Sequence, residues 1–579
     1  MPNMIQNAKD SISQILNAAY QKAAEKGELP AGAALSGTVE IPKDSANGDF
    51  AANHAMAGAK ALHMAPRKIA ETLIANADLA DTWFASVEVA GPGFINFRLA
   101  DRWYADVLQA VTREGADYGR SDIGHGQKVM VEFVSANPTG PMHMGNARGG
   151  VLGDALASVL DRAGYQVWRE FYVNDAGNQI EKFANSIDAR YQQLLLGEEQ
   201  VAFPEDGYHG DDIKDLAKLF YEANGDKYLT VPVAERHQAM AEFGLQRNIP
   251  KMQEDLRRYG IEYDQWFFES ELHESGYVAE SVQKLTDRGY TYEKDGALWL
   301  KTSQILAEQL LKAGKKQEEI DKLELKDDVL RRANGFYTYF AADIAYHRNK
   351  LEKRGFDKVI NVWGADHHGH VARLKGAMDA LGLDGEHRLD IVLMQLVKLT
   401  RNGEVVRMSK RTGKAISLTD LLDEIPVDAA RYFFNSRPES PVEFDLELAI
   451  RQDSENPVYY VQYAHARICT LLSALAAEGH TVPASADAAL LSTPEEKELI
   501  KQLAALPEEI RLAARDYDPS RINRYVTELA ARFHRFYTAC RIKGAAEGVL
   551  EARLLLADTV RRVIALSLGI IGVSAPEKM

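Results

Sequence analysis

Residues 128 to 175 place a buried strand, a polar loop, a helix and a second strand in immediate succession. Val129 to Val134 is an apolar run typical of a buried strand, and the pattern from Met144 to Ala163 predicts a helix that ends at Gly164. Val167 to Val173 predicts the next strand. A connection this short favours parallel pairing in a right-handed βαβ unit. We therefore expect a fold organised around a parallel sheet.

Two later apolar runs extend the same sheet. Val359 to Trp363 and Ile391 to Val397 predict further parallel strands, so the expected fold class is α/β with a doubly wound, Rossmann-like sheet. We place this central domain at residues 119–450. Its segment from about 190 to 330 is charged and mainly helical in periodicity, which predicts a helical insertion that decorates the sheet without building it.

Smaller domains are expected on either side. Residues 1–118 predict an α+β domain, because Ile5, Ile12 and Leu16 fall at helical spacing and Val87 to Leu99 alternates around a Gly-Pro-Gly turn. Residues 451–579 are rich in Ala, Leu and Arg and predict an all-α domain. Helix breaks are expected there at four prolines: Pro483, Pro494, Pro507 and Pro519.

The chain has only two cysteines, Cys469 and Cys540, among 579 residues. This usage fits a reducing compartment and excludes a zinc site built from three or four cysteines. The first residues lack a signal-peptide pattern, and the longest apolar run, Val563 to Val573, is far short of the ~20 residues of a membrane span. We expect a soluble, cytoplasmic protein with no membrane partner.

The net charge of −16 argues against a polyanionic partner for the chain as a whole. Residues 451–579, however, contain 16 Lys or Arg and 16 Asp or Glu, so the acidic excess lies upstream and a nucleic acid could bind a local basic face here. Four arginines at helical spacing predict a phosphate-binding stripe: Arg521, Arg524, Arg532 and Arg535. The alternative is an ordinary solvated face that includes Glu528.

The segment Pro141 to Arg148 follows a strand and opens a helix. Helix N-termini present free N–H groups and the positive end of the helix dipole, which favour phosphate. Gly145 would let a flat ring such as adenine lie against the backbone, while His143 and Asn146 can donate hydrogen bonds to phosphoryl oxygens. The alternative is a helix in which the His and Asn side chains are ordinary caps.

A second polar segment, Arg407 to Lys414, places four cations within eight residues after a buried strand. Such a cluster requires an anion or solvent, so the alternatives are a phosphate-binding loop and a solvated surface loop. Together, His-x-Gly-Asn at His143 and Met-Ser-Lys at Lys410 resemble the paired signatures of class I aminoacyl-tRNA synthetases. Asn146 stands where those signatures have a second His, and Arg407 where they have the first Lys.

This resemblance implies an ATP-dependent ligase with Mg²⁺ accompanying ATP. It implies that His143 and Lys410 are catalytic and that ATP is bound by residues of both signatures: His143, Gly145, Asn146, Met408, Ser409 and Lys410. The 267 positions between His143 and Lys410 leave too little room for the editing domain of the Leu, Ile and Val enzymes. Two cysteines cannot make the zinc site of the cysteine enzyme.

Further segments resemble the bacterial arginyl-tRNA synthetases along the whole chain. Glu132 to Pro138 is similar to the Glu-Phe-x-Ser-x-Asn-Pro pattern of that family, and Tyr339 to Ala345 to its Tyr-x-x-x-Asp-Ile-Ala pattern. Four shorter segments also match: Asn47 to Ala51, Gly91 to Asn96, Asp428 to Arg431, and Ala575 to Met579. The resemblance implies activation of arginine to arginyl-AMP, transfer to tRNA(Arg), an N-terminal domain that contacts the tRNA elbow, and a monomer.

Physical chemistry supports arginine as the substrate. A guanidinium group is planar and always charged, so it requires a carboxylate, which Asp343 can supply. Tyr339 lies one helical turn earlier and can pack on the planar cation. The resemblance assigns polar groups of the substrate to Glu132 and Asn137. The alternatives are a helix-surface acid at Asp343 and a core aromatic at Tyr339.

Three histidines, His367, His368 and His370, follow the strand that ends near Trp363. A metal site is one interpretation, but no cysteine nearby completes it. In class I synthetases the corresponding loop lies beside the ATP ribose, so Gly364 and Asp366 are nucleotide candidates and the histidines are candidates for lining the pocket. Two rival functions remain: an adenylyl-transferring ligase without a tRNA product, and an inactive tRNA-binding paralogue.

Overall fold

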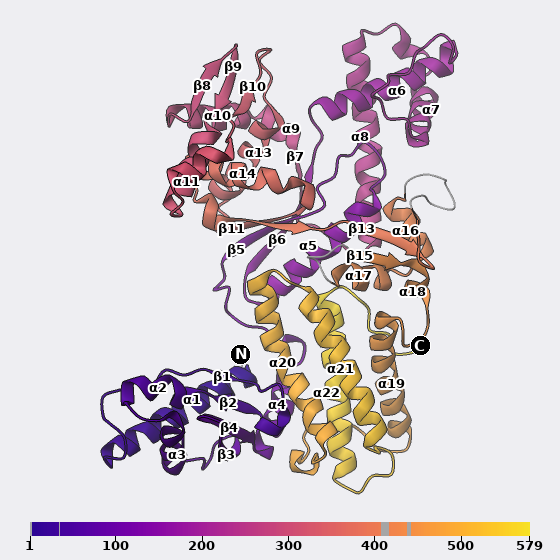
Figure 1. Ribbon diagram of the computed structural model, residues 1–579. Coiled ribbons are helices and arrows are strands. Elements are labelled where there is room, and N and C mark those ends of the chain that lie inside the picture. Colours follow the sequence, from indigo (N-terminus) through magenta and orange to yellow (C-terminus); the bar gives the residue numbers. More distant parts are fainter. Residues whose placement is uncertain (1–2, 34, 407–415, 437–441) are drawn as a thin grey trace.

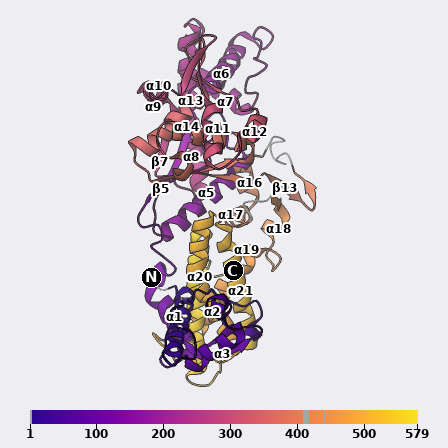
Figure 2. The same cartoon turned by 60° about the vertical axis from the view of Figure 1, so that its left-hand side comes forward.

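The structure is a computed structural model that describes residues 3–33, 35–406, 416–436 and 442–579. A parallel sheet lies at its centre, and two arms rise above the sheet (Figure 1). The N-terminal domain and the C-terminal helices lie below the sheet, side by side. When the molecule is turned, α1 to α3 come to lie in front of the lower ends of α20 and α21 (Figure 2).

The central sheet has the strand order β12-β11-β5-β6-β7, and all neighbouring strands are parallel. Its strands are β5 (Lys128–Glu132), β6 (Gln166–Val173), β7 (Gln265–Phe268), β11 (Lys358–Gly364) and β12 (Leu389–Met394). The chain moves outward in one direction from β5 and returns on its other side at β11. This reversal creates a topological switch point, where ligands bind beyond the carboxyl ends of the strands. The predicted doubly wound sheet is confirmed.

Helix α5 (Met144–Arg162) can pack closely on this sheet because glycines occupy positions on the face that meets it. A Cβ atom added at Gly153 would lie 2.1 Å from the Phe133 ring, and one added at Gly149 would lie 3.1 Å from the Met394 side chain. Glycine therefore sets the depth of the helix and brings its first turn to the carboxyl end of β5.

The predicted insertion, about residues 190–330, supplies most of the two arms, and helices after residue 338 complete the second arm. One arm contains α6 (Asn178–Leu196), α7 (Asp211–Asn224) and α8 (Val233–Arg258). The other contains α9 (Glu269–Glu274), α10 (Tyr277–Asp287), β8 (Thr291–Lys294), β9 (Ala297–Leu300), α11 (Thr302–Lys312), α12 (Gln317–Ile320), β10 (Asp328–Arg331), α13 (Tyr339–Arg348), α14 (His368–Ala380) and α15 (Gly385–Arg388).

The expectation that residues 190 to 330 form a helical insertion is therefore wrong in part. Strand β7 pairs with β6 and forms an edge of the central sheet, and β8, β9 and β10 form an antiparallel sheet of their own. These strands have four residues each. Runs this short carry too few alternations to be separated from the helical periodicity that surrounds them.

The N-terminal domain packs helices on an antiparallel sheet of order β1-β2-β4-β3. Its elements are α1 (Met4–Glu25), β1 (Val39–Glu40), β2 (Phe50–Ala52), α2 (His54–Leu62), α3 (Pro66–Asn76), β3 (Phe84–Ala90), β4 (Phe94–Leu99) and α4 (Asp101–Glu114). The predicted hairpin is confirmed, since β3 pairs antiparallel with β4 around Gly91 and Gly93, which both have positive φ.

A short connecting region and the C-terminal helices complete the chain. The connecting elements are β13 (Val397–Arg401), β14 (Glu404–Val405), α16 (Leu418–Glu424), α17 (Val427–Asn435), β15 (Val442–Asp445) and α18 (Leu446–Ile450). The C-terminal helices are α19 (Pro457–Ala477), α20 (Pro494–Asp516), α21 (Ser520–Ala539) and α22 (Val549–Ile570). The predicted all-α C-terminal domain is confirmed.

Arg431, on α17, joins several of these parts through one buried guanidinium. It donates to the Tyr259 and Gly260 carbonyls at the end of α8, at 3.0 and 3.1 Å, and to the Ile571 carbonyl after α22, at 3.2 Å. The same group pairs with Asp154 on α5. The Arg431 guanidinium therefore holds together helix α5, one arm and the C-terminal end of the chain.

Pro507 does not break a helix as predicted, because it lies inside α20. A proline there cannot donate to the carbonyl four residues earlier, which belongs to Leu503. The buried Tyr118 hydroxyl donates to that carbonyl instead, at 2.9 Å. A side chain that lies 385 positions earlier in the sequence thus replaces the missing bond of the helix.

We expect Tyr118→Phe to reduce the free energy of unfolding by about 1–3 kcal/mol, because it leaves the buried Leu503 carbonyl without a donor. The loss should shrink when Pro507→Ala restores a backbone N–H. Hydrogen exchange along α20 and denaturant unfolding of the four variants of this cycle measure both effects. Tyr221→Phe, at an exposed tyrosine, serves as the control. An equal loss with and without Pro507 would contradict this account.

Candidate active site

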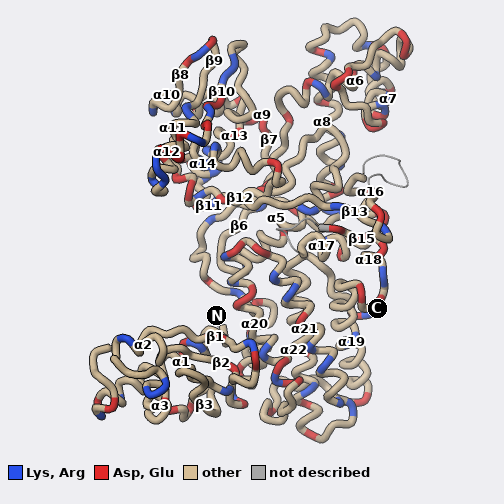
Figure 3. Tube along the Cα trace, in the orientation of Figure 1, with Lys and Arg blue, Asp and Glu red and all other residues tan. Residues whose placement is uncertain are grey.

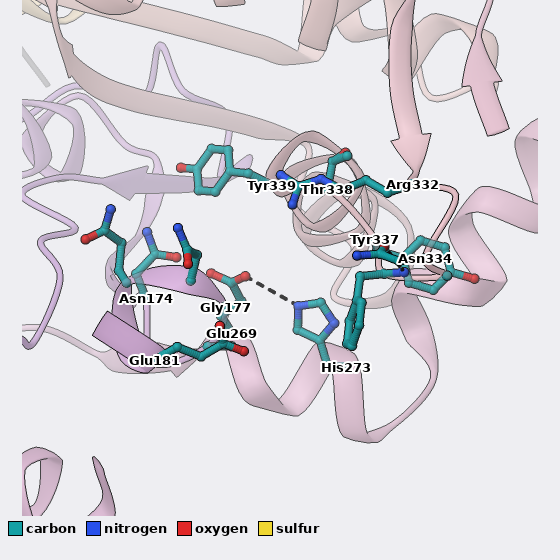
Figure 4. A pocket seen from close by; sticks show the side chains of 15 residues that line it. Asn174, Gly177, Glu181, Glu269, His273, Arg332, Asn334, Tyr337, Thr338 and Tyr339 are labelled. Carbon is teal, nitrogen blue, oxygen red and sulfur yellow. Dashed lines mark hydrogen bonds and ion pairs between the residues drawn. The ribbon is translucent and has the colours of Figure 1, made fainter. Parts of the chain in front are cut away.

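Two neighbouring cavities open at the carboxyl end of the central sheet. The inner cavity has a volume of about 270 Å³ and lies over β5 and β11, at the switch point of the sheet. The outer cavity, of about 730 Å³, lies between the two arms and is shown in Figure 4. Asn174 and Tyr339 line both cavities, so the two are contiguous.

The inner cavity brings together residues that were predicted from distant parts of the sequence. Its lining includes five of the predicted site residues: Glu132, Asn146, Tyr339, Asp343 and Gly364. Two of the three histidines, His367 and His370, also line it. Five other candidates within the described chain are not part of the lining: Asn137, His143, Gly145, Asp366 and His368. Met408, Ser409 and Lys410 lie outside the described residues.

The first turn of α5 fits both interpretations of the segment around His143, helix capping and phosphate binding. The backbone N–H of His143, the N-cap residue, donates to Asn146 Oδ1 at 3.1 Å, so Asn146 caps the helix. The amide nitrogen of Asn146 remains available on the cavity side. His143 and Gly145 are exposed, and the space beside the Gly145 Cα atom is open. The helix N-terminus therefore presents a surface that can accept phosphate or a flat ring.

Asp343, on α13, is held by two imidazole rings. His347 Nδ1 lies 3.0 Å from one carboxylate oxygen, and His370 Nε2 lies 2.6 Å from the other. Burial alone would raise the pKa of the Asp343 carboxyl, but His347 and His370 hold that pKa below its ordinary value. Asp343 is therefore ionised at neutral pH.

The partners of the two rings show that both are neutral. His347 Nε2 accepts from the Asn361 amide at 2.6 Å, and His370 Nδ1 accepts from the Arg373 guanidinium at 3.1 Å. Each ring uses its other nitrogen to donate to Asp343, so each has one proton. The rings orient the carboxylate but do not neutralise it. A negative charge in the wall of a small cavity is what a guanidinium requires.

Glu132, at the end of β5, differs from Asp343 because a buried cation of the protein pairs with it. Lys350 is fully buried in the π-helical turn that continues α13, and its ammonium pairs with Glu132. The other carboxylate oxygen of Glu132 accepts from the Ser135 hydroxyl at 2.8 Å. Because Glu132 is compensated within the protein, Asp343 is the better counterion for a cationic substrate.

The backbone after β5 is strained at the cavity. Val134 and Ser135 have φ values of 71° and 46°, and both residues line the inner cavity. A β-branched residue rarely adopts such a conformation, which costs on the order of 1–3 kcal/mol. The hydrogen bond between Ser135 and Glu132 helps to hold this turn. The strain also explains why the strand ends at Glu132 and not at Val134 as predicted.

Sequence reasoning missed Glu269, which lines the outer cavity. It is only 5% exposed, and its Oε1 atom lies 3.4 Å from His273 Nε2. Burial, together with the nearby Glu269 and Asp343 carboxylates, raises the pKa of Tyr172 well above its usual value. The signal for Glu269 was its position directly after β7, a strand that the helical interpretation had overlooked.

The four arginines predicted to form a phosphate stripe lie on α21 and are all paired with acids. Arg521 pairs with Glu509, Arg524 with Asp518, Arg532 with Glu498, and Arg535 with Glu528. Lys and Arg residues are interspersed with Asp and Glu residues over the C-terminal helices α19 to α22 (Figure 3). Arg524 and Arg535 keep more than half of their side chains exposed.

An aromatic patch on α19 and α21 was also missed. We define it as Tyr459, Tyr463, Arg467, His534 and Tyr537. Tyr459 and Tyr463 are nearly parallel, with ring centroids 6.2 Å apart, and His534 lies 6.1 Å beyond Tyr463. The Arg467 guanidinium covers the Tyr537 ring at 4.1 Å. The spacing of Tyr459, Tyr463 and Arg467, four residues apart, was the available signal.

Comparison with known proteins agrees with this architecture. Residues 107–442 match the family described as "tRNA synthetases class I (R), catalytic domain". Residues 6–99 match "Arginyl tRNA synthetase N terminal domain", and residues 461–579 match "DALR anticodon binding domain". The sheet, its switch-point cavity and the catalytic-domain match define a class I aminoacyl-tRNA synthetase.

Individual relatives narrow the class to one family. An arginine–tRNA ligase of Acetivibrio thermocellus is 52% identical and one of Caldanaerobacter subterraneus is 54% identical, and each alignment covers all of both chains. The chain belongs to the arginyl-tRNA synthetase family. Its fold is shared by the arginyl-tRNA synthetase structure of Thermus thermophilus, with a TM-score of 0.72 at 21% identity over 99% of this chain and 100% of that one.

We expect Asp343→Asn to weaken arginine binding by roughly 30-fold or more, because removing one partner of a desolvated charge pair costs about 2–5 kcal/mol. ATP binding should change little. The variant should also lose its preference for arginine over citrulline, the neutral isostere. Calorimetric titration of the folded variant with arginine, citrulline and ATP measures all three.

Asp295→Asn is the matched control, because Asp295 lies in an exposed turn at φ 52°, which Asn also adopts readily. Its arginine affinity should equal that of the unaltered protein. Retained arginine binding in Asp343→Asn, with weakened ATP binding, would place Asp343 in the nucleotide site instead.

Proposed function

We propose that this chain activates L-arginine with ATP to form arginyl-AMP and transfers the arginyl group to the 3′-terminal adenosine of tRNA(Arg), releasing AMP and diphosphate. Membership of the arginyl-tRNA synthetase family supports the reaction. The uncompensated Asp343 carboxylate beside Tyr339 is the observation that carries the choice of arginine.

ATP is proposed to bind over the N-terminus of α5. His143, Gly145 and Asn146 would receive its phosphates and adenine, with Gly364 and Asp366 toward the ribose. Met408, Ser409 and Lys410 would approach from the other signature. Mg²⁺ is proposed to enter with ATP, since phosphate oxygens and water are its usual ligands in such sites.

In the first step, the arginine carboxylate attacks the α-phosphorus, the bond to the β-phosphate oxygen breaks, and diphosphate leaves. The site needs only to align these groups and stabilise charge, for which His143 and Lys410 are our candidates. In the second step, the 2′-hydroxyl of the terminal adenosine attacks the arginyl carbonyl carbon and AMP leaves with its electron pair. Glu132 and Asn137 are proposed to orient the polar groups of arginine.

We propose domain boundaries near residues 118 and 450, in agreement with the order of the three family matches. The protein is proposed to act as a monomer in the cytoplasm, where its tRNA substrate is found. Among the described residues, no helix is long and apolar enough to cross a membrane.

The aromatic patch is proposed to contact the unpaired bases of the anticodon loop. Single-stranded RNA binds by stacking its bases on aromatic rings beside cations, and this patch offers parallel tyrosines with Arg467 among them. The patch lies in the segment that matches the anticodon-binding domain. The predicted arginines, above all the exposed Arg524 and Arg535, would add phosphate contacts around it.

The purified protein should charge tRNA with arginine and with no other amino acid. Aminoacylation assayed with each amino acid, together with ATP–diphosphate exchange with and without tRNA, tests this proposal. Robust charging with lysine, glutamine or cysteine would overturn it. Exchange without any tRNA product would support the ligase that does not act on tRNA, and tRNA binding without exchange would support an inactive paralogue.

We expect Tyr463→Ala to raise the KM for tRNA by roughly fivefold or more, since loss of one base–aromatic stack costs about 1–3 kcal/mol. The KM values for arginine and ATP should stay the same, because the substitution lies in the C-terminal domain. Leu490→Ala, an exposed apolar residue of that domain outside the patch, is the control. An unchanged KM for tRNA in Tyr463→Ala would remove the patch from the RNA interface.

A further inference from the structure

A buried lysine lies directly behind the inner cavity, and no step of the proposed reaction uses it. Lys350 is fully buried and is not part of the lining of either cavity at the sheet. Asp343, His347 and Lys350 are four and three residues apart, so they form one row along α13 and its π-helical continuation (Asn349–Lys353). The row begins with the carboxylate in the wall of the cavity and ends with a buried ammonium.

The Lys350 ammonium has an acceptor for each of its three N–H groups. It pairs with Glu132, and it lies 3.3 Å from Asn361 Oδ1 and 3.4 Å from His347 Nε2. The face of the Tyr346 ring lies 4.0 Å from the same nitrogen and adds a cation–π contact. Because a buried charge is costly without such partners, this set of contacts is what keeps a charged lysine at the back of the cavity.

The same ammonium acts on the histidine that holds Asp343. Lys350 Nζ and the Asn361 amide nitrogen both approach His347 Nε2, so this ring nitrogen is an acceptor. The proton of the ring is then on Nδ1, which donates to Asp343. A second proton on His347 would place two cations in contact, which the ammonium disfavours. Lys350 therefore fixes the tautomer of His347 and keeps the ring neutral.

The charges at the inner cavity add up to a single negative charge within the described chain. Its lining contains two acids, Glu132 and Asp343, and Lys350 neutralises the first. Burial raises the pKa values of three nearby tyrosines well above their usual range, so these are uncharged: Tyr172, Tyr263 and Tyr346. The other titratable groups around the cavity are Tyr339 on α13, His370 on α14 with Arg373, Glu170 on β6 with Arg354, and Glu269 on α9 with His273.

We infer that Lys350 is a positioning residue that determines the charge selectivity of the arginine pocket. By neutralising Glu132 and fixing the tautomer of His347, it leaves Asp343 as the single counterion for a guanidinium group. A cationic side chain is then bound without gain or loss of a proton. This inference rests on the proposed function, because it requires arginine as the ligand of the inner cavity.

Substitution of Lys350 should couple arginine binding to the release of a proton. Lys350→Gln removes the charge but keeps a donor for Glu132, and Lys350→Met removes both. Burial disfavours an unpaired carboxylate, so Glu132 of either variant should take up a proton in the empty pocket and release it when the guanidinium binds. The arginine affinity of both variants should therefore increase by roughly three- to tenfold per pH unit between about pH 6.5 and 8.

Isothermal titration calorimetry in two buffers of different ionisation enthalpy counts the protons released. Citrulline has the same α-amino and α-carboxyl groups as arginine but an uncharged side chain, so it should bind to both variants without the additional proton release. The unaltered protein should show no difference in proton release between arginine and citrulline. Arg553→Gln is the matched control, because it breaks the ion pair with the fully buried Glu496 side chain in the C-terminal helices and should bind arginine as the unaltered protein does.

Thermal unfolding shows whether each variant is folded. Arginine affinity in Lys350→Gln and Lys350→Met that has the pH dependence of the unaltered protein would overturn the inference, as would an equal loss of arginine and citrulline affinity at every pH. If neither variant folds, the unaltered protein still decides, since additional proton release with arginine would show that Glu132 and His347 are not held in these states. Failure of the proposed function is distinct, because the unaltered protein would then neither bind nor charge arginine.

Discussion

The arrangement of the domains depends on the buried Arg431 guanidinium. Its partners are Asp154 on helix α5, two carbonyls at the end of an arm, and the Ile571 carbonyl near the C-terminus. Gly572 makes the close approach possible, because a Cβ atom there would lie 2.0 Å from the guanidinium. Losing one partner of such a buried pair typically costs about 3–5 kcal/mol, so these parts of the protein are positioned together.

That constraint helps to position a site assembled from distant segments of the chain. The first turn of α5 is fixed in depth by glycines against the sheet and in direction by Asp154. The inner cavity then forms between this turn and α13. Within it, Glu132 and Asp343 differ in their partners, since Lys350 lies beside Glu132 and two histidines lie beside Asp343.

Much of this could be predicted from the sequence, because the signals were local. The βαβ unit, the hairpin around Gly91 and the one-turn spacing of Tyr339 and Asp343 follow from periodicity and turn chemistry. The rest depended on contacts between distant positions. Strand β7 was too short to recognise, Glu269 was hidden behind it, and the partner of Glu132 is 218 positions away. No local pattern shows which carboxylate a lysine will neutralise.

The hydroxyl of Tyr118 that completes α20 at Pro507 also imposes an order in time. The two ends of this bond are separated by 385 residues, which a ribosome adding about 5–20 residues per second needs roughly 20 to 80 s to synthesise. For that interval the tyrosine is present without its acceptor, and the N-terminal domain lacks α20, the helix against which it packs. The surface around Tyr118 therefore stays without its packing partner until the last domain is synthesised. During that time it is a surface of the nascent chain that chaperones would protect.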